Sequence, residues 1–579
     1  MQRIYLYTIS LLLIWCCSCK KTKIEPYEHT GSVLVGPPST IRLYNVSNGN
    51  LNIAVNNVQL TNFEPVNAPV GNVVLGTELG LKYFPDGVWK ARNDGSPFTI
   101  PANLLDRNGR ARIIIAPGKA KKSNEIPGTI SKDTTIQDNP QQPRDYFILS
   151  DGTIRSFPRT TSVPVKPDHF KLRIIHIGGD DNQLGLAGPV TLTFADGSPV
   201  HPLLTQVVPG NTSDYVEIPY GTYQFKLFAK GDYSKQLSEA PNLPRFDPCS
   251  RTPGLQVALE PLIRSFKPGG TYSVLVFKKA FGFACGDLIE PAVDNGYVII
   301  TDVSPQNTSY ARIQAANAYP GGNINFKING QKLADALAFG RASGYSVVVT
   351  GRQRIEAFDE TGKLLAQSDY PFSAADNITV WLFNKNGKAE MLFVQNTMGA
   401  YRFRTGNTND DAVEGASMIE KFDYAWQTRF LNVSSDASNV TFSNDGIPFS
   451  IIQAVAGGGR DTINRPIAYE NLSIGKAAEH DPYIIIPYNI NSMSNIGPSF
   501  TSAANIRVHN SSQGQVPGPV IFSIDALNFQ SFIANGNMYP TGSLPASETG
   551  IYTVALIGKI AEGAPASEKA KLMIVKHNQ

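Results

Sequence analysis

Histidines and clustered carboxylates are the residues with the most direct route to catalysis, and here they form no recognisable catalytic pattern. Of the seven histidines, His29 lies in the expected tether and His577 near the last residue of the sequence, whereas His176 and His509 lie on repeated strands, where we expect a structural role. The sequence contains no Gly-x-Ser-x-Gly elbow, no Walker loop and no Gly-x-Gly-x-x-Gly turn. Asp180-Asp181 could offer oxygens to Ca²⁺, but the spacing matches no EF-hand loop. We therefore predict no enzymatic activity, no metal site and no cofactor.

The first nineteen residues contain an apolar stretch that leads to a cysteine. Arg3 precedes an apolar stretch, residues 4–15, which has the length of a signal-peptide core and falls short of the ~20 residues of a membrane-spanning helix. Small residues then precede Cys19. This arrangement resembles the lipobox of bacterial lipoproteins.

The lipobox resemblance implies cleavage behind Ser18 and acylation of Cys19. Cys16 and Cys17 are alternatives, because each also lies near the end of the apolar stretch. Lys20 after the acylated residue favours passage to the outer membrane. We thus expect a signal peptide at 1–18, a polar tether at 19–38 and a lipid-anchored protein on the periplasmic or the cell-surface face. Ordinary secretion and an uncleaved anchor are the competing readings.

Two further cysteines, Cys249 and Cys285, could pair. An export compartment permits disulfides, and closing a loop of this length would stabilise the fold by about 3–4 kcal/mol in the chain-entropy model. Two unpaired buried thiols are the alternative. No Cys-x-x-Cys or His-x-x-x-His accompanies them, so we expect no zinc site.

Four aromatic residues are candidates for ligand binding. Trp89 with Tyr83, and Trp426 with Tyr424, could stack on sugar rings if their faces are exposed. Neighbouring Asn, Gln or Asp side chains would then fix the hydroxyls. The competing reading is that these rings belong to the core, as aromatic side chains usually do.

The composition indicates which elements must position such residues. The chain has 579 residues, of which only 17% are charged, with 50 Gly and 40 Pro. This balance is typical of strands and turns and suits an exported β-protein. The net charge of +3 is spread along the chain without a basic stripe, so no nucleic-acid partner is expected.

A short strand that begins with arginine recurs along the chain. Its copies begin near Arg42, Arg173, Arg312, Arg429 and Arg507. Most copies are followed by an alternating strand, and several of these lead into Asp-Gly or Asn-Gly, the strongest local hairpin signal. The arginines are 78 to 139 residues apart, and repeat units of this length predict serial domains. We interpret the arginines as strand-edge charges that discourage pairing between molecules, or as partners of carboxylates.

A second signature, strand then Pro-x-Gly then strand, recurs at residues 215–227 and 267–276, and a Gly-x-Tyr-Thr-Val strand occupies residues 550–554. Together with the arginine strands, these motifs resemble the domain-of-unknown-function 4397 family, found in tandem in bacterial envelope lipoproteins. The likeness is clearest at 170–277, 308–395 and 504–579. It implies immunoglobulin-like sandwiches and no established activity.

The predicted fold is therefore all-β: serial immunoglobulin-like antiparallel β-sandwich domains after a lipoprotein signal peptide. The expected sandwiches span 39–156, 169–304, 308–404 and 427–579, with a linker at 405–426. The last region could instead be two short units, 427–502 and 503–579. Residues 119–144 are interpreted as a long loop within the first domain.

Function is predicted from this architecture. Tandem sandwiches give reach and repeated surfaces, so we expect a non-catalytic binding or adhesion module for polysaccharide or a protein partner, held on the membrane by its lipid. The alternative is a structural accessory lipoprotein of an envelope complex with no small-molecule ligand.

Overall fold

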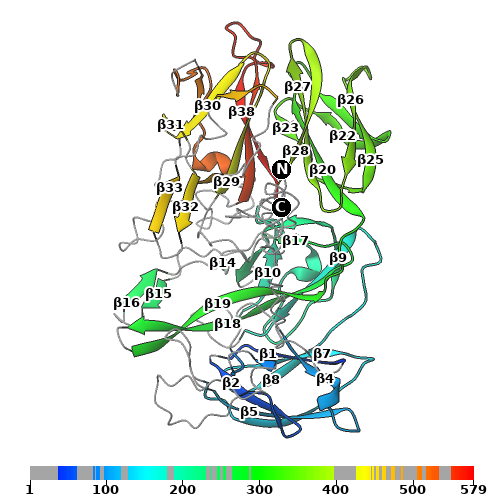
Figure 1. Cartoon of the computed structure of the whole chain (residues 1–579), viewed down its shortest axis with the longest axis vertical. Coiled ribbons are helices and arrows are strands. Elements are labelled where there is room, and N and C mark those ends of the chain that lie inside the picture. The colour runs from blue at the N-terminus through cyan, green and yellow to red at the C-terminus, as the bar shows by residue number, and fades with distance from the viewer. Residues whose placement is uncertain are drawn as a thin grey trace, which may run out of the picture. The chain divides into compact units, whose positions relative to one another are not determined.

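The fold is known from a computed structural model. It describes residues 37–47, 49–61, 83–84, 87–90, 97–118, 128–178, 188–229, 235–236, 244–247, 252–255, 264–285, 288–396, 426–444, 446–448, 451–455, 459–463, 471–475, 484–486, 505–511, 517–533 and 550–579. Apart from three short 3-10 turns, Ala102–Leu104, Pro202–Leu204 and Phe529–Phe532, the regular elements of these residues are strands (Figure 1), which confirms the all-β prediction. Within them, no helix has the length and hydropathy needed to span a bilayer.

The chain divides into two compact units. One contains Met1–Ala91 and Pro97–Ile154, and the other contains Arg92–Ser96 and Arg155–Gln579. The strands of the first unit form what we call the first sandwich. Those of the second unit form the second, third and fourth sandwiches.

The first sandwich encloses its core between two sheets. One has the order β4-β1-β7-β8 and the other the order β3-β2-β5-β6. Period-two alternation is plainest in β5, where Ala111, Ile113 and Ile115 are buried between exposed or half-buried neighbours. The strands are β1 (Pro38–Asn45), β2 (Leu51–Val55), β3 (Val58–Gln59), β4 (Phe98–Pro101), β5 (Arg110–Pro117), β6 (Lys132–Gln137), β7 (Arg144–Ile148) and β8 (Ile154–Pro158).

The second sandwich is built around the sheet β11-β9-β18-β19, with the smaller sheet β10-β13-β14 and the pairs β12-β17 and β15-β16. Its strands are β9 (His169–His176), β10 (Val190–Thr193), β11 (Val216–Pro219), β12 (Gly221–Tyr223), β13 (Lys226–Ala229), β14 (Lys235–Gln236), β15 (Pro244–Asp247), β16 (Thr252–Leu255), β17 (Arg264–Phe266), β18 (Thr271–Cys285) and β19 (Leu288–Val303).

The third sandwich packs the sheet β23-β20-β27-β28, with β24 also on β20, against the sheet β22-β21-β25-β26. Its strands are β20 (Tyr310–Ala318), β21 (Ile324–Ile328), β22 (Gln331–Leu337), β23 (Arg341–Ala342), β24 (Ser346–Val349), β25 (Gly351–Phe358), β26 (Leu364–Phe372), β27 (Asn377–Lys385) and β28 (Lys388–Gln395).

In the fourth sandwich, the two halves of the region after residue 426 contribute strands to the same sheets. β29 pairs with β37, and β30 pairs with β36, around one hydrophobic cluster. The strands are β29 (Trp426–Ser434), β30 (Asn439–Asn444), β31 (Ile447–Pro448), β32 (Ile451–Val455), β33 (Gly459–Ile463), β34 (Leu472–Ser473), β35 (Ile484–Ile486), β36 (Ile506–Asn510), β37 (Gly550–Gly558) and β38 (Lys571–Lys576).

One pairing recurs in all four sandwiches. The arginine-led strand runs parallel to a strand 65 to 124 residues later, as in β1 with β7, β9 with β18, β20 with β27 and β29 with β37. The other described ladders between these strands are antiparallel, as expected. In the chain, strands of the opposite sheet lie between each arginine strand and its parallel partner. Local sequence patterns therefore do not predict the parallel pairing.

The arginines of these strands are interior, so their interpretation as strand-edge charges is wrong for four of the five. Each of the strands β1, β9, β20 and β29 has a neighbour on both sides in its sheet. Arg42 is 8% exposed, and Arg173, Arg312 and Arg429 are 1–2% exposed. The carboxylate reading holds for Arg42, which forms a two-pronged ion pair with Asp145 at 2.7 and 2.8 Å.

Candidate functional site

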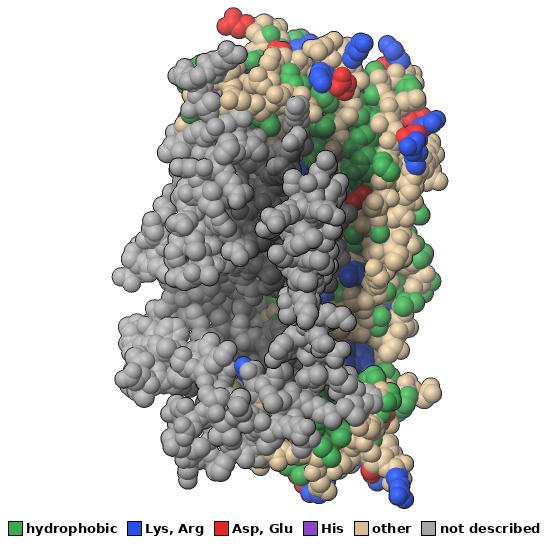
Figure 2. Space-filling view, viewed as in Figure 1, with side chains coloured by type: hydrophobic (Ala, Val, Ile, Leu, Met, Phe, Trp, Pro, Cys, Tyr) green, Lys and Arg blue, Asp and Glu red, His purple; other side chains and the backbone are tan. Residues whose placement is uncertain are grey.

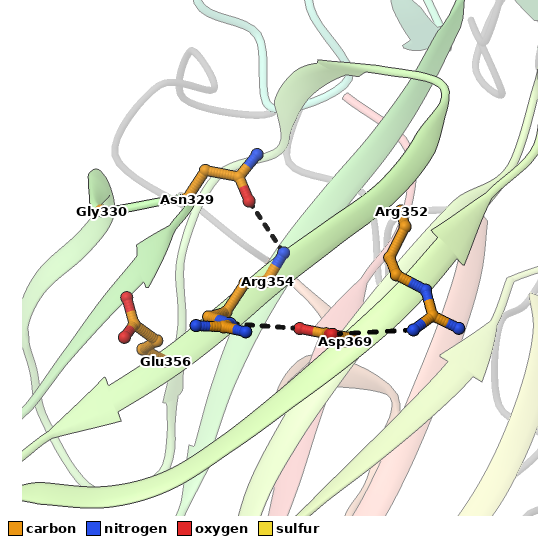
Figure 3. A pocket seen from close by; sticks show the side chains of 6 residues that line it. All are labelled: Asn329, Gly330, Arg352, Arg354, Glu356 and Asp369. Atoms are coloured by element: carbon orange, nitrogen blue, oxygen red, sulfur yellow. Dashed lines mark hydrogen bonds and ion pairs between the residues drawn. The ribbon is translucent and has the colours of Figure 1, made fainter.

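A shallow polar hollow lies on the outer face of the third sandwich. It has a volume of about 490 Å³ and is lined by Asn329, Gly330, Arg352, Arg354, Glu356 and Asp369 (Figure 3). Figure 2 shows basic and acidic side chains side by side where β25 and β26 lie in Figure 1. The hollow therefore offers a ligand both donors and acceptors of charge-assisted hydrogen bonds.

Strand geometry places the lining residues on one face. Arg352, Arg354 and Glu356 alternate along β25, while Ile355 and Ala357, which alternate with them, are buried in the core. β26 pairs antiparallel with β25 and sets Asp369 directly opposite Arg354. Cross-strand register therefore brings the carboxylate to the arginines.

A tight turn closes the hollow at its other end. Asn329 and Gly330 join β21 to β22 with φ of 48° and 76°, the two left-handed residues of a hairpin turn that the Asn-Gly dipeptide favours. Asn329 Oδ1 accepts a hydrogen bond from the backbone N–H of Arg354 at 2.8 Å. The turn is thus tied to the strand that carries the arginines.

Asp369 lies between the two guanidinium groups (Figure 3). Arg354 Nε donates to Asp369 Oδ1 at 3.2 Å, and Arg352 Nη1 lies 3.8 Å from Asp369 Oδ2. The side chains of Arg352, Arg354 and Asp369 are 77%, 58% and 36% exposed. Such exposed pairs contribute little to stability, so the arrangement remains open to a ligand.

The two arginines bring many hydrogen-bond donors to the hollow. Each guanidinium carries five N–H donors in a planar fork, and a carboxylate accepts up to about four hydrogen bonds. The donors of the two arginines therefore exceed what Asp369 can accept. The lining residues include no serine, cysteine or histidine, and no group of metal-ligating side chains was found among the described residues.

The aromatic pair predicted in the first sandwich lies at its core. Trp89 is 2% exposed and exchanges backbone hydrogen bonds with Leu51 at 2.8 and 2.9 Å. Tyr83 is half-buried against the same cluster, and burial raises the pKa of its hydroxyl. Stacking on a sugar needs an exposed ring face, which Trp89 lacks, so the core reading is the correct one for this residue.

The other predicted site residues are only partly covered by the structure. The backbone of Trp426 pairs with Ile486 and Gly550 in β29, and Cys285 ends β18. Cys19, Cys249 and Tyr424 lie outside the described residues. Lipidation, the disulfide and the second aromatic pair therefore stay predictions.

A buried polar network joins the third and fourth sandwiches, and sequence reasoning missed it. Arg429 Nη2 donates to Asn396 Oδ1 at 2.5 Å and to Thr553 Oγ1 at 3.0 Å. His577 contacts Thr553 Oγ1 through Nε2 at 2.7 Å and the Tyr345 hydroxyl through Nδ1 at 2.9 Å. Burial, and then the charge of Arg429, hold the pKa of His577 well below its usual value.

His509 also takes part in a buried contact, and this one resembles a nucleophile with its base. Ser443 Oγ lies 2.7 Å from His509 Nε2, and His509 Nδ1 lies 2.9 Å from the carbonyl oxygen of Gly518. Ser443 is 0% and His509 is 3% exposed. The serine oxygen is therefore out of a substrate's reach, and the pair acts as a bond between β30 and β36.

Comparison with known families finds a match for one part of the chain. A family model described as Domain of unknown function (DUF4397) matches residues 311–412. The match begins within β20 and includes the strands of the third sandwich that carry the polar hollow. No curated protein matches the chain.

Proposed function

We propose that this chain is a lipid-anchored cell-envelope protein of tandem β-sandwich repeats that acts as a non-catalytic binding module for polysaccharide or a protein partner. The observation that carries the proposal is the polar hollow of the third sandwich. Arg352 and Arg354 present largely exposed forks there beside carboxylate and amide groups. Sugars are bound by such combinations of donors and acceptors.

The membrane attachment in this proposal rests on the sequence around Cys19. Several acyl chains on that residue would give lasting attachment, where a single chain gives only marginal binding. Lys20 supports the outer membrane as destination, with the sandwiches on either face. Mass spectrometry of the N-terminal peptide tests this point, because acylation must disappear in Cys19→Ser.

The tandem character rests on the recurring pairing. The same parallel ladder occurs in all four sandwiches, although the family match covers only the third. We assign the first, second and fourth sandwiches to the same repeat on this basis. Grafting the arginine strand of one sandwich into another tests the equivalence, since true repeats tolerate the exchange with little loss of stability.

A glycan array probed with the full-length chain in detergent tests binding. We expect selective binding to a subset of polysaccharides, and no binding by a heat-unfolded sample. A blank array with folded protein would overturn polysaccharide binding. Crosslinking on whole cells would then test for a protein partner at the same hollow.

A structural accessory role is the second candidate, and one observation favours it. The third and fourth sandwiches share a buried apolar cluster that includes Trp381 and Phe383 from one side and Leu431 and Met573 from the other. A joint of this kind suits a stiff support. Strong crosslinks to envelope proteins combined with a blank array would favour this role over ligand binding.

A further inference from the structure

The chemistry of the polar hollow narrows the class of ligand. Arg352 and Arg354 are two residues apart on one strand, roughly 7 Å along it. Asp369 is the acceptor that both approach. A second carboxylate could therefore use the outward N–H groups of both forks, as planar, two-pronged arginine contacts favour.

The acceptors of the hollow point to more than a simple anion. Glu356 follows Arg354 on the same face, and in Figure 3 its carboxylate lies beside that arginine. Together with Asp369 it can accept hydrogen bonds from hydroxyl groups. Inorganic phosphate or polyphosphate has few donors to offer these carboxylates, whereas an acidic sugar carries a carboxylate and several hydroxyls on one ring.

We propose that the polar hollow binds the carboxylate-bearing sugars of an acidic polysaccharide, with Arg352 and Arg354 on the sugar carboxylate and Glu356 and Asp369 on its hydroxyls. This inference rests on the proposed function and specifies its ligand. A neutral polysaccharide would satisfy the acceptors only. It would leave the arginines without the negative charge that their forks fit.

The test measures binding of polygalacturonate, neutral dextran and polyphosphate to the full-length chain in detergent by calorimetry. We expect polygalacturonate to bind more tightly than either competitor, and its affinity to fall as salt is raised because the groups are exposed. The double variant Arg352→Gln with Arg354→Gln should weaken polygalacturonate binding at least tenfold. Arg107→Gln is the matched control, an exposed arginine of the first sandwich, and should change nothing.

Three results would overturn the inference. Dextran binding as tight as polygalacturonate binding would remove the role of the sugar carboxylate. Equal or tighter binding of polyphosphate would show a general anion site. Polygalacturonate binding that survives the double arginine substitution would place the ligand elsewhere. The proposed binding of polysaccharide survives the first of these results but fails if no polysaccharide binds at all, so the two failures can be told apart.

Discussion

Two ion pairs of the first sandwich show how surroundings decide what a charged residue contributes. Arg42 and Asp145 meet in the interior, with side chains 9% and 1% exposed. Arg112 and Asp133 meet at 2.6 Å on the surface, with both side chains about half exposed. Removing one partner of a buried pair leaves an uncompensated charge, whereas water solvates the survivor of an exposed pair.

We predict that Arg42→Ala destabilises the first sandwich by about 3–5 kcal/mol, because the buried Asp145 would lose its ion pair with the guanidinium. Arg112→Ala should cause a much smaller change. Urea unfolding of both variants measures the difference. Equal losses for the two would contradict the assignment of Arg42 to the interior.

Acid sensitivity is the second prediction at this scale. His577 has a folded pKa well below its usual value, so the folded chain keeps it neutral while the unfolded chain takes up a proton below about pH 6.5. Stability is therefore complete above that pH and falls by roughly 1.4 kcal/mol per unit on acidification. The pKa of His176 is also lowered by burial, and it adds to the slope.

His577→Gln should flatten part of this slope, although it also loses contacts at neutral pH. The free energies of unfolding of the parent and the variant, measured between pH 7.5 and pH 5, give the two slopes. A variant whose stability falls as steeply as that of the parent would show that His577 is not held neutral.

At the scale of elements, short-range signals predicted hairpins well and long-range pairings poorly. The Asn329-Gly330 turn forms as expected, because its conformation is set by the two residues themselves. Residues 119–144 were expected to be loop throughout, yet Lys132–Gln137 pairs with β5 as an edge strand. Its partner β5 is the strand that precedes it, but only Ile136 of its six residues is buried, so the segment lacks the alternation of apolar and polar residues that predicts a strand.

The same limit applies to the candidate site. The hairpin beneath the polar hollow could be predicted, but the approach of Asp369 to Arg354 depends on the register of β25 with β26. Likewise, sequence could not decide which aromatic rings face inward, since Trp89 lies outside the long strands and joins the sheet through an isolated bridge to Leu51. The arginines of the hollow follow the alternation of β25, a signal that could have identified them.

Gly330→Ala should cost about 1 kcal/mol or more, since a side chain resists its φ of 76° although no atom lies within 4 Å of the added carbon. Gly344 is the matched control. It is equally open but has no left-handed φ, so Gly344→Ala should be close to neutral. Thermal unfolding distinguishes the two, and an unchanged Tm in Gly330→Ala would contradict the strain argument.

At the scale of the whole chain, the sequence predicts serial domains. It does not predict that the third and fourth sandwiches share a hydrophobic cluster. Ala316, Trp381 and Val394 of the third sandwich pack in one cluster with Leu431 and Ile557 of the fourth. These residues alternate with those of the inner cores, so both faces of the strands are apolar. A strand that is buried on both faces has no alternation of apolar and polar residues, so its sequence does not show which face contacts a neighbouring domain.

Trp381→Ala should cost about 3–5 kcal/mol, because a fully buried side chain at this joint is replaced by a void. Hydrogen exchange should rise in β27 and also in β29 and β37 across the joint. Faster exchange confined to the third sandwich would show that the two sandwiches do not depend on each other.

The most direct test of the central claim compares two aspartate variants on the glycan array. Asp369 lies in the polar hollow, whereas Asp335 is paired with Lys332 on β22 and does not line it. If the hollow is the binding site, Asp369→Asn weakens polysaccharide binding severalfold, because Asp369 is assigned to the sugar hydroxyls. Asp335→Asn leaves the binding unchanged. Identical array profiles for both variants and the parent chain would contradict the claim.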